Sequence, residues 1–444
     1  MNPRAGNVRS LAAGVVDRTL TTRGPADHLL QRVEADLRPL DRGLLRELVL
    51  GTLRWLRRLD AVVEAASSRR LQAIDPSLRT PLRIAVYQLL FLDRVPAHAA
   101  VHEAVSEARL RTHRGGAGFV NAVLRRVARA PQLESWPVEE ANSTRRLAIE
   151  LSHPDLLVER WLQVFGESRT RDLLSANNRV KPLQLLTFRG RGGRDRTAAS
   201  LAAEGVETQP SEVAPMGLVV TEGNPLETNS FQGGSIYLQD VASQAAALVP
   251  PPKTGDRVVD LAAAPGGKSF SLLSWEPDLR VIAADRSWRR MGPLQENRNR
   301  LGLQIELVQA DALRPPFRAS FDRVVLDVPC TGTGTLRKNP ELKWRISAEE
   351  IDRLASQGSA MLEAGSRQVR RGGVLTMVTC SLEPEENAEV VSRFLETNHD
   401  FELMPLQPEL PTALGKWVMN TGGWQVLPAG VHDGFTVHAL RRRR

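Results

Sequence analysis

The residues with the clearest chemical potential in this sequence are its two cysteines, Cys330 and Cys380. Two cysteines are too few for a disulfide framework, and their spacing is not that of a zinc site or a redox pair. Each follows a run of aliphatic residues typical of a buried strand, so we expect both thiols at the carboxyl edge of one sheet. Because a thiolate is a strong nucleophile, the pair is a candidate for covalent catalysis.

Acidic residues occupy equivalent positions at the ends of four successive expected strands. They are Asp260, Asp285, Asp311 and Asp327. Ligands of open α/β sheets bind at this edge, and Asp285, at the end of the second strand, can accept both hydroxyls of a ribose. A single aspartate at such a position is often a helix cap, but four in succession favour a ligand site.

A loop of small residues follows the first of these strands. It consists of Ala262, Ala263, Ala264, Pro265, Gly266, Gly267 and Lys268. Small side chains let the backbone approach a ligand closely. The loop has neither the GxGxxG spacing of dinucleotide sites nor the GxxxxGK[ST] spacing of phosphate loops. A ligand with a ribose and an adenine but no phosphate fits better, so we expect S-adenosylmethionine as a methyl donor.

A thiol beside a methyl donor indicates methylation of C5 of cytosine. That carbon cannot attack a sulfonium unaided, so a thiolate must first add to C6 and make C5 enamine-like. Loss of the C5 proton after methyl transfer then allows the thiol to leave. Asp327 could hold the N3/N4 edge of the base in the protonated form that favours addition. Methylation of an exocyclic amine would need no such thiol.

These motifs resemble those of the RNA cytosine-5 methyltransferases of the Sun (Fmu) group. The likeness is carried by residues 260–269, 327–330 and 379–381, with further matches at 331–335, 339–344 and 383–387. The resemblance implies that Cys380 is the nucleophile and that Cys330 assists release of the product. It also implies that the loop at 262–268 binds S-adenosylmethionine together with Asp285, Asp311 and Asp327.

The remaining sequence predicts two further domains. Residues 1–135 have helical periodicity, and 41–51 and 118–125 are similar to the RNA-binding fold of the antitermination factor NusB. Residues 143–234 are mixed, which predicts a small α+β domain for RNA recognition. Residues 235–444 alternate strands with helices, which predicts a Rossmann-like α/β catalytic domain with a doubly wound parallel sheet. This layout resembles that of bacterial small-subunit rRNA methyltransferases.

Short aliphatic or β-branched runs predict the strands that position these residues. We expect strands at 183–188, 217–220, 258–261, 281–284, 305–308, 324–326 and 374–378. A helix is expected at 156–165.

Composition favours a polyanionic partner. The net charge is +8, and only 5% of the residues are aromatic, which argues against a large platform for stacking on single strands. A genomic codon bias is an equal explanation for the many arginines. The resemblance implies 16S rRNA as the partner and not DNA, and we expect a monomer. No apolar run reaches membrane length and residues 1–10 lack a signal-peptide core, so we expect a cytoplasmic protein without a membrane partner.

Other features leave alternatives open. His98 and His102 lie four apart without further ligands nearby, so no metal is expected. Six arginines bracket Gly115 and Gly116 and form either a solvated face or a track for RNA phosphates. They are Arg109, Arg111, Arg114, Arg125, Arg126 and Arg129. Alternative functions are methylation of tRNA and an RNA-binding ribosome-assembly factor without turnover.

Overall fold

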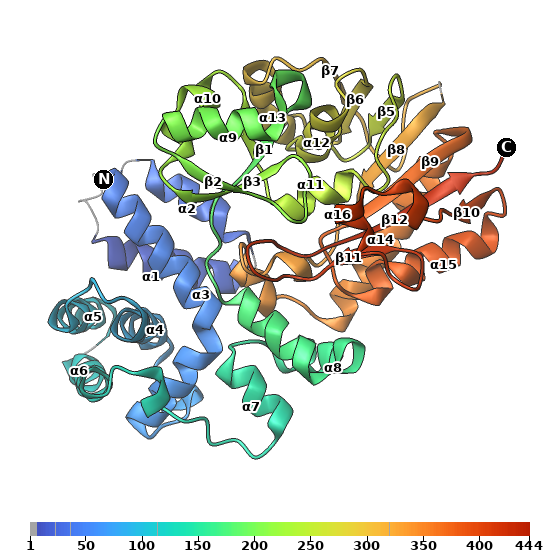
Figure 1. Ribbon diagram of the computed structural model, residues 1–444. Coiled ribbons are helices and arrows are strands. Elements are labelled where there is room, and N and C mark those ends of the chain that lie inside the picture. Colours follow the sequence, from blue (N-terminus) through green and yellow to red (C-terminus); the bar gives the residue numbers. More distant parts are fainter. Residues whose placement is uncertain (1–6, 23, 36, 113, 319) are drawn as a thin grey trace. The chain divides into compact units, whose positions relative to one another are not determined.

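The computed structural model describes residues 7–22, 24–35, 37–112, 114–318 and 320–444. The chain divides into two compact units (Figure 1). The first comprises Met1–Arg179 and Leu336–Arg345, and the second comprises Val180–Thr335 and Ile346–Arg444.

The first unit is helical, as the sequence predicts for the N-terminal region. Its helices are α1 (Val8–Thr22), α2 (Ala26–Glu34), α3 (Pro39–Ser67), α4 (Pro76–Phe91), α5 (Ala97–Arg111), α6 (Arg114–Arg129), α7 (Ser143–Glu150) and α8 (Asp155–Asn177). Helix α3 supplies the centre of the core, where Leu45, Leu48 and Leu59 are fully buried at helical spacing. Asp75 is the N-cap of α4, and its side chain accepts a hydrogen bond from the Ser77 amide.

Helix α8 is longer than the sequence pattern predicts. The expected helix at 156–165 ends where the structure has a kink at Gly166, whose φ is +75°. The helical stretch then resumes and reaches Asn177. The glycine explains the difference, because it allows a left-handed backbone between two stretches that pack as one element.

A short segment from the C-terminal half of the sequence is embedded in this helical unit. Lys343, which is fully buried, donates hydrogen bonds to the carbonyls of Arg54 and Ser152, each at 3.2 Å, and to Oδ1 of Asn178 at 2.7 Å. Burial lowers the pKa of Lys343 well below its ordinary value. The three acceptors match the three N–H donors of an ammonium group and hold Lys343 in the helical unit.

The second unit begins with a small antiparallel sheet. Its strands are β1 (Gln184–Thr187), β2 (Glu207–Pro210), β3 (Gly217–Glu222) and β4 (Ile236–Leu238), in the order β2-β3-β1-β4. Helix α9 (Gly193–Ala203) packs on it through Leu201, which is buried with Leu185 and Leu218. This is the small mixed fold that the sequence predicts within 143–234, whereas residues 143–179 of that range belong to the helical unit.

The large sheet of the second unit carries the predicted site. Its strands are β5 (Arg257–Asp260), β6 (Arg280–Asp285), β7 (Ile305–Gln309), β8 (Phe321–Asp327), β9 (Val369–Thr379), β10 (Phe401–Leu403), β11 (Trp424–Val426) and β12 (Phe435–Arg442). Strands β9, β8, β5, β6 and β7 are neighbours in that order and run parallel.

The five strands predicted for this sheet are parallel as expected, and the sheet has in addition an antiparallel edge that was not predicted from the sequence. Strand β12 pairs antiparallel with β9, and β10 and β11 both pair antiparallel with β12. The sheet is therefore mixed. A parallel partner would need another crossover, whereas the C-terminal segment enters beside β9 in the opposite direction.

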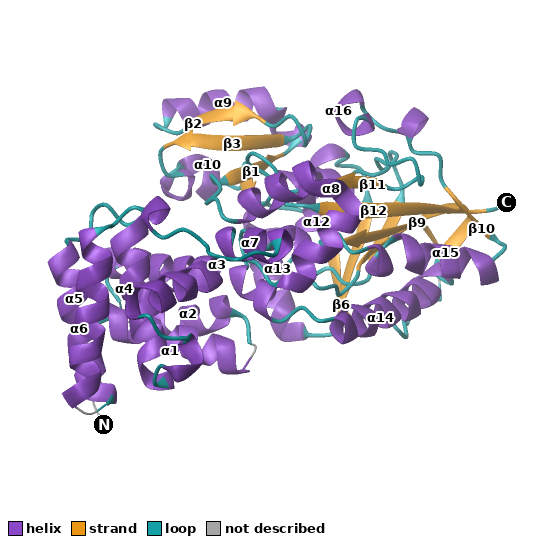
Figure 2. Ribbon diagram, turned by 90° about the horizontal axis from the view of Figure 1, so that it is seen from below, coloured by secondary structure: helices purple, strands orange, loops and turns teal. Residues whose placement is uncertain are grey.

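Helices cover both faces of this sheet. On one face α14 (Ala348–Ser366) and α15 (Ala388–Thr397) lie together along β9 (Figure 2), and Leu375 and Met377 contribute to their core. On the other face lie α11 (Val241–Ala247), α12 (Gly267–Trp275) and α13 (Trp288–Arg300). Within the described residues, no helix has the length and apolar character required to cross a bilayer.

Candidate active site

The two cysteines lie side by side at the carboxyl edge of the large sheet. Cys380 directly follows β9, and Cys330 lies three residues beyond β8. The two strands are parallel neighbours, and the amide of Val328 donates to the carbonyl of Val378 at 3.0 Å. The two Sγ atoms are therefore 3.4 Å apart, and both side chains remain partly exposed.

The surroundings of the two thiols are not equivalent. The contact with Cys380, together with burial and the nearby carboxylates of Glu386 and Asp327, raises the pKa of Cys330 well above its ordinary value. The raised pKa favours the thiol form of Cys330. Either sulfur could be the donor of the hydrogen bond between the two side chains.

Asp327 and Lys268 form an ion pair beside the thiols. The Lys268 Nζ atom lies 2.9 Å from Oδ2 of Asp327 and 3.2 Å from the hydroxyl of Ser243. Burial by itself would lower the pKa of Lys268, but the attraction of Asp327 outweighs it and the pKa is raised. The side chain of Asp327 is 35% exposed, so it can still reach a bound base.

Asp260 has the most perturbed carboxyl group at this edge. Its side chain is fully buried at the end of β5, and burial is the main cause that raises its pKa to about 7. The hydroxyl of Ser269 donates to Oδ2 at 2.9 Å, while Oδ1 has no hydrogen-bond partner of normal geometry among the described residues. An unsatisfied buried carboxylate oxygen fits a cationic ligand group, such as the ammonium of S-adenosylmethionine.

The side chains of Asp285 and Asp311 accept hydrogen bonds from backbone amides at the same edge of the sheet. Asp285 is buried and accepts hydrogen bonds from the amides of Ala264, at 3.3 Å, and Ser287, at 2.9 Å. Asp311 is partly buried and accepts one from the amide of Leu313 at 3.0 Å. The strand order β8-β5-β6-β7 brings these two residues to the same edge as Asp260 and Asp327, as predicted, and their bonds shape the loops there.

The predicted small-residue loop runs from β5 into α12. Ala263 and Ala264 are buried, whereas Pro265 is exposed. Gly266 has φ +110°, and a Cβ at this position would lie 2.6 Å from the ring of Phe270. The turn therefore requires glycine, and it leaves backbone rather than side chain facing the sheet edge.

Sequence reasoning did not single out Glu386, which the structure places between the cysteine loops. Its Oε1 accepts the amide of Thr331 at 2.8 Å, and its Oε2 accepts the hydroxyls of Thr331, at 2.5 Å, and Ser381. The motif at 383–387 drew attention to this stretch, but nothing in the sequence indicates which of its three glutamates faces the thiols.

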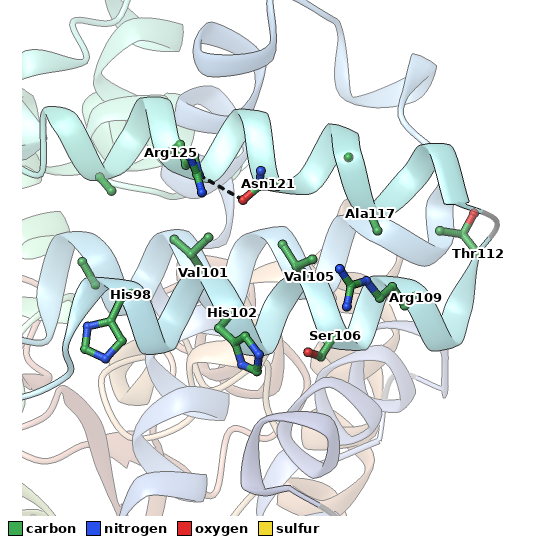
Figure 3. Close-up of a pocket in the computed structure, with 13 residues that line it drawn as sticks. His98, Val101, His102, Val105, Ser106, Arg109, Thr112, Ala117, Asn121 and Arg125 are labelled. Atoms are coloured by element: carbon green, nitrogen blue, oxygen red, sulfur yellow. Dashed lines mark hydrogen bonds between the residues drawn. The ribbon is translucent and has the colours of Figure 1, made fainter.

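The helical unit has a groove of about 1080 Å³ between α5 and α6 (Figure 3). Exposed His98, His102, Arg109 and Arg125 line it, and none of its thirteen lining residues is acidic. The side chain of Arg114 lies outside the described residues. No group of three or more histidine, cysteine or acidic side chains in the described part of the chain is arranged to hold a metal ion.

Comparison with known families supports this architecture. The family described as 16S rRNA methyltransferase RsmB/F matches residues 247–441. The NusB family matches residues 6–129, and the ferredoxin-like domain of RsmF/B-like methyltransferases matches residues 153–227. The three matches follow the order of the predicted helical, mixed and α/β regions.

Relatives match nearly the whole length of the chain. The chain is 32% identical to the probable ribosomal RNA small subunit methyltransferase B of Bacillus subtilis, covering 98% of this chain and 99% of that protein. It is 30% identical to ribosomal RNA small subunit methyltransferase B of Photorhabdus laumondii, with the same coverage. The crystal structure of PH0851 is 25% identical with a TM-score of 0.77, covering 99% of this chain and all of that one. The chain therefore belongs to the RsmB/F family of 16S rRNA methyltransferases.

Proposed function

We propose that this protein methylates C5 of a cytosine in 16S rRNA, with S-adenosylmethionine as donor and a covalent bond between Cys380 and C6 of the base. The observation that carries the proposal is the contact of the two thiols beside the Asp327–Lys268 pair. A methyltransferase acting on a nucleophilic amine would have no use for a thiol pair in this position. The printed names of the full-length relatives support small-subunit rRNA as the substrate.

The chain's own residues supply the activation of the base. Cys380 adds to C6 as a thiolate, and this makes C5 nucleophilic. Asp327, whose charge is balanced by Lys268, holds the N3/N4 edge of the cytosine. The donor, when bound, provides an electrophilic methyl group. Cys330 keeps its proton in the free protein and acts late, when the C5 proton is removed and Cys380 departs.

The residues around the small-residue loop fit the donor. Asp260 offers its unpartnered oxygen to the ammonium group, and Asp285 lies where the ribose hydroxyls are expected. The backbone at 262–268 approaches the ligand closely because its side chains are small. Asp311 shapes the neighbouring loop through its bond to Leu313.

We propose that the helical unit anchors the RNA. The groove between α5 and α6 combines two exposed arginines with two exposed histidines and lacks acidic lining residues. Such a surface attracts phosphates without reading sequence. The roles proposed for residues 1–135, 143–234 and 235–444 are therefore RNA anchoring, RNA recognition and catalysis.

Bisulfite sequencing of total RNA tests the substrate and the modified atom together, because 5-methylcytosine resists conversion. A strain without this gene should lose one protected cytosine in its 16S rRNA. The wild-type gene should restore it, whereas a gene encoding Cys380→Ala should not. Loss of a protected cytosine in a tRNA, with the 16S pattern unchanged, would contradict the proposed substrate.

A further inference from the structure

We propose that Glu386 is a positioning residue that holds the loops of Cys330 and Cys380 together, so that the distance between the two thiols depends on its carboxylate. The inference rests on the proposed function, which gives the thiol pair its catalytic purpose. It assigns Glu386 no direct contact with the base or the methyl donor.

The contacts of Glu386 join the residues that directly follow the two cysteines. Thr331 comes immediately after Cys330, and Ser381 comes immediately after Cys380. One carboxylate accepts both the backbone amide and the hydroxyl of Thr331 and also the hydroxyl of Ser381. The two loops are 50 residues apart in the sequence, and this side chain joins them at the residues next to the cysteines.

The buried location makes these bonds costly to lose. Glu386 is 2% exposed, and its environment raises its pKa, with burial as the main cause and the hydrogen bonds from Ser381 and Thr331 opposing it. Ionised carboxylates only accept hydrogen bonds, which matches the three donors that face this one. Without the carboxylate, the Thr331 amide would remain buried without its acceptor.

Some neighbouring bonds hold one loop and others also join the two. The Thr333 hydroxyl accepts the amide of Leu382 at 2.8 Å, and the hydroxyls of Thr331 and Ser381 lie 3.4 Å apart. Asn387 accepts the hydroxyl of Thr379 at 2.5 Å and donates to the carbonyl of Ser381 at 3.1 Å, so it supports the Cys380 side. The amide of Gly334 donates to the carbonyl of Cys380 at 2.8 Å. This backbone contact keeps the loops adjacent, but it lies four residues beyond Cys330. The immediate neighbour of Cys330 is held by Glu386.

The variant Glu386→Gln keeps the size and shape of the side chain but removes its charge and replaces one acceptor oxygen with a donor group. Its amide group would face at least one of the donors and disturb the link between Thr331 and Ser381. Glu389→Gln is the matched control, because it makes the same chemical change at an exposed residue three positions further along the chain.

The first readout uses the free protein and needs no methylation. Phenylarsine oxide forms two As–S bonds with a close pair of thiols and releases one water, without a change of oxidation state. Because the chain has two cysteines, stable binding reports this pair. We expect Glu386→Gln to bind the arsenical about tenfold more weakly than wild type, because the second As–S bond depends on the effective concentration of the other thiol. Glu389→Gln should bind like wild type.

The second readout separates positioning from donor binding. In Glu386→Gln, kcat should fall by about 10²-fold because the thiols are misplaced, while KM for S-adenosylmethionine should change less than about twofold. If Glu386→Gln does not fold, as judged by its thermal transition, Glu386→Asp keeps the charge with a shorter reach and undergoes the same two measurements.

The outcomes distinguish this inference from the proposed function. A folded variant that binds phenylarsine oxide as tightly as wild type would overturn the role of Glu386. Weaker arsenical binding, combined with a wild-type protein that methylates no cytosine, would support the positioning role and refute the proposed function. A rise in KM for the donor without a fall in kcat would overturn the positioning role, because it would place Glu386 at the donor site.

Discussion

The cysteine loops and the groove between α5 and α6 differ in how their polar side chains are held. In the cysteine loops, short polar side chains are buried and bonded to one another, as in the set Thr331, Ser381 and Glu386. In the groove, long basic side chains such as Arg109 and Arg125 are exposed. Formation of a covalent bond requires fixed positions, whereas attraction of a flexible polyanion requires charge that can adapt.

The largest expected effect is the loss of methylation when a residue beside the cysteine loops is replaced. Asp327→Ala removes both the partner of Lys268 and the group proposed to hold the base, so methylation should fall by about 10³-fold. RNA affinity and its dependence on salt should stay as in wild type, because phosphate contacts are proposed elsewhere. Steady-state methyl transfer and filter binding measure the two quantities. A variant with normal turnover would remove Asp327 from the mechanism.

Charge reversal in the groove should affect RNA binding more than turnover, in contrast to Asp327→Ala. Arg109→Glu combined with Arg125→Glu should weaken RNA binding roughly 10²-fold and lower the slope of log affinity against log salt by about two. Turnover at saturating RNA should change little. The same reversal at the exposed Arg18 and Arg32 is the control. Equal losses in both double variants would mean that net charge, and not this groove, anchors the RNA.

Donor binding should depend on the edge of the sheet and not on the groove. At about 100 times its dissociation constant, S-adenosylmethionine should stabilise the wild-type protein by about 2.7 kcal/mol. Asp285→Ala should lose most of this shift, and Asp285→Asn, which keeps one acceptor oxygen, should retain part of it. Thermal unfolding with and without the donor gives the values. An undiminished shift in Asp285→Ala would place the donor elsewhere.

The smallest expected effect is the change of donor affinity with pH. The pKa of Asp260 is raised to about 7, so its proton must leave before the carboxylate can pair with a cation. Affinity for S-adenosylmethionine should therefore be nearly full above about pH 8, half lost near pH 7, and about tenfold lower at pH 6 than at pH 8. Calorimetric titration at several pH values measures this change. Asp260→Asn should remove the pH dependence, and an unchanged slope in that variant would assign it to another group.

The same comparison shows what the sequence could predict. The meeting of Cys330 with Cys380, and of the acidic residues at the strand ends, followed from one rule: parallel neighbouring strands end at the same edge. Helical periodicity likewise predicted the bundle that contains α3. Helical periodicity and the residue that ends a strand are each visible within a short stretch of sequence, so both can be recognised without knowing the fold.

Features whose distant partners are not identified by the strand-end rule or by periodicity were not predictable. Residues 336–345 follow the Cys330 loop in sequence, yet Lys343 is satisfied by carbonyls of the helical unit. Strand β12 pairs antiparallel with β9, and its hydrophobic run alone does not specify that direction. The link from Glu386 to Thr331 spans 55 residues. In each case the deciding bond joins segments whose proximity is set by the fold.

The central claim is the division of labour between the two thiols, and trapping of a covalent protein–RNA complex tests it most directly. Each cysteine variant is incubated with 16S rRNA and S-adenosylmethionine, boiled in detergent and separated on a denaturing gel. Cys380→Ala should give no adduct, because C5 is never activated. Cys330→Ala should add to the base and transfer the methyl group, then remain attached to the RNA after about one turnover. An adduct with Cys380→Ala and none with Cys330→Ala would reverse the assignment, and no adduct with either would contradict the covalent mechanism.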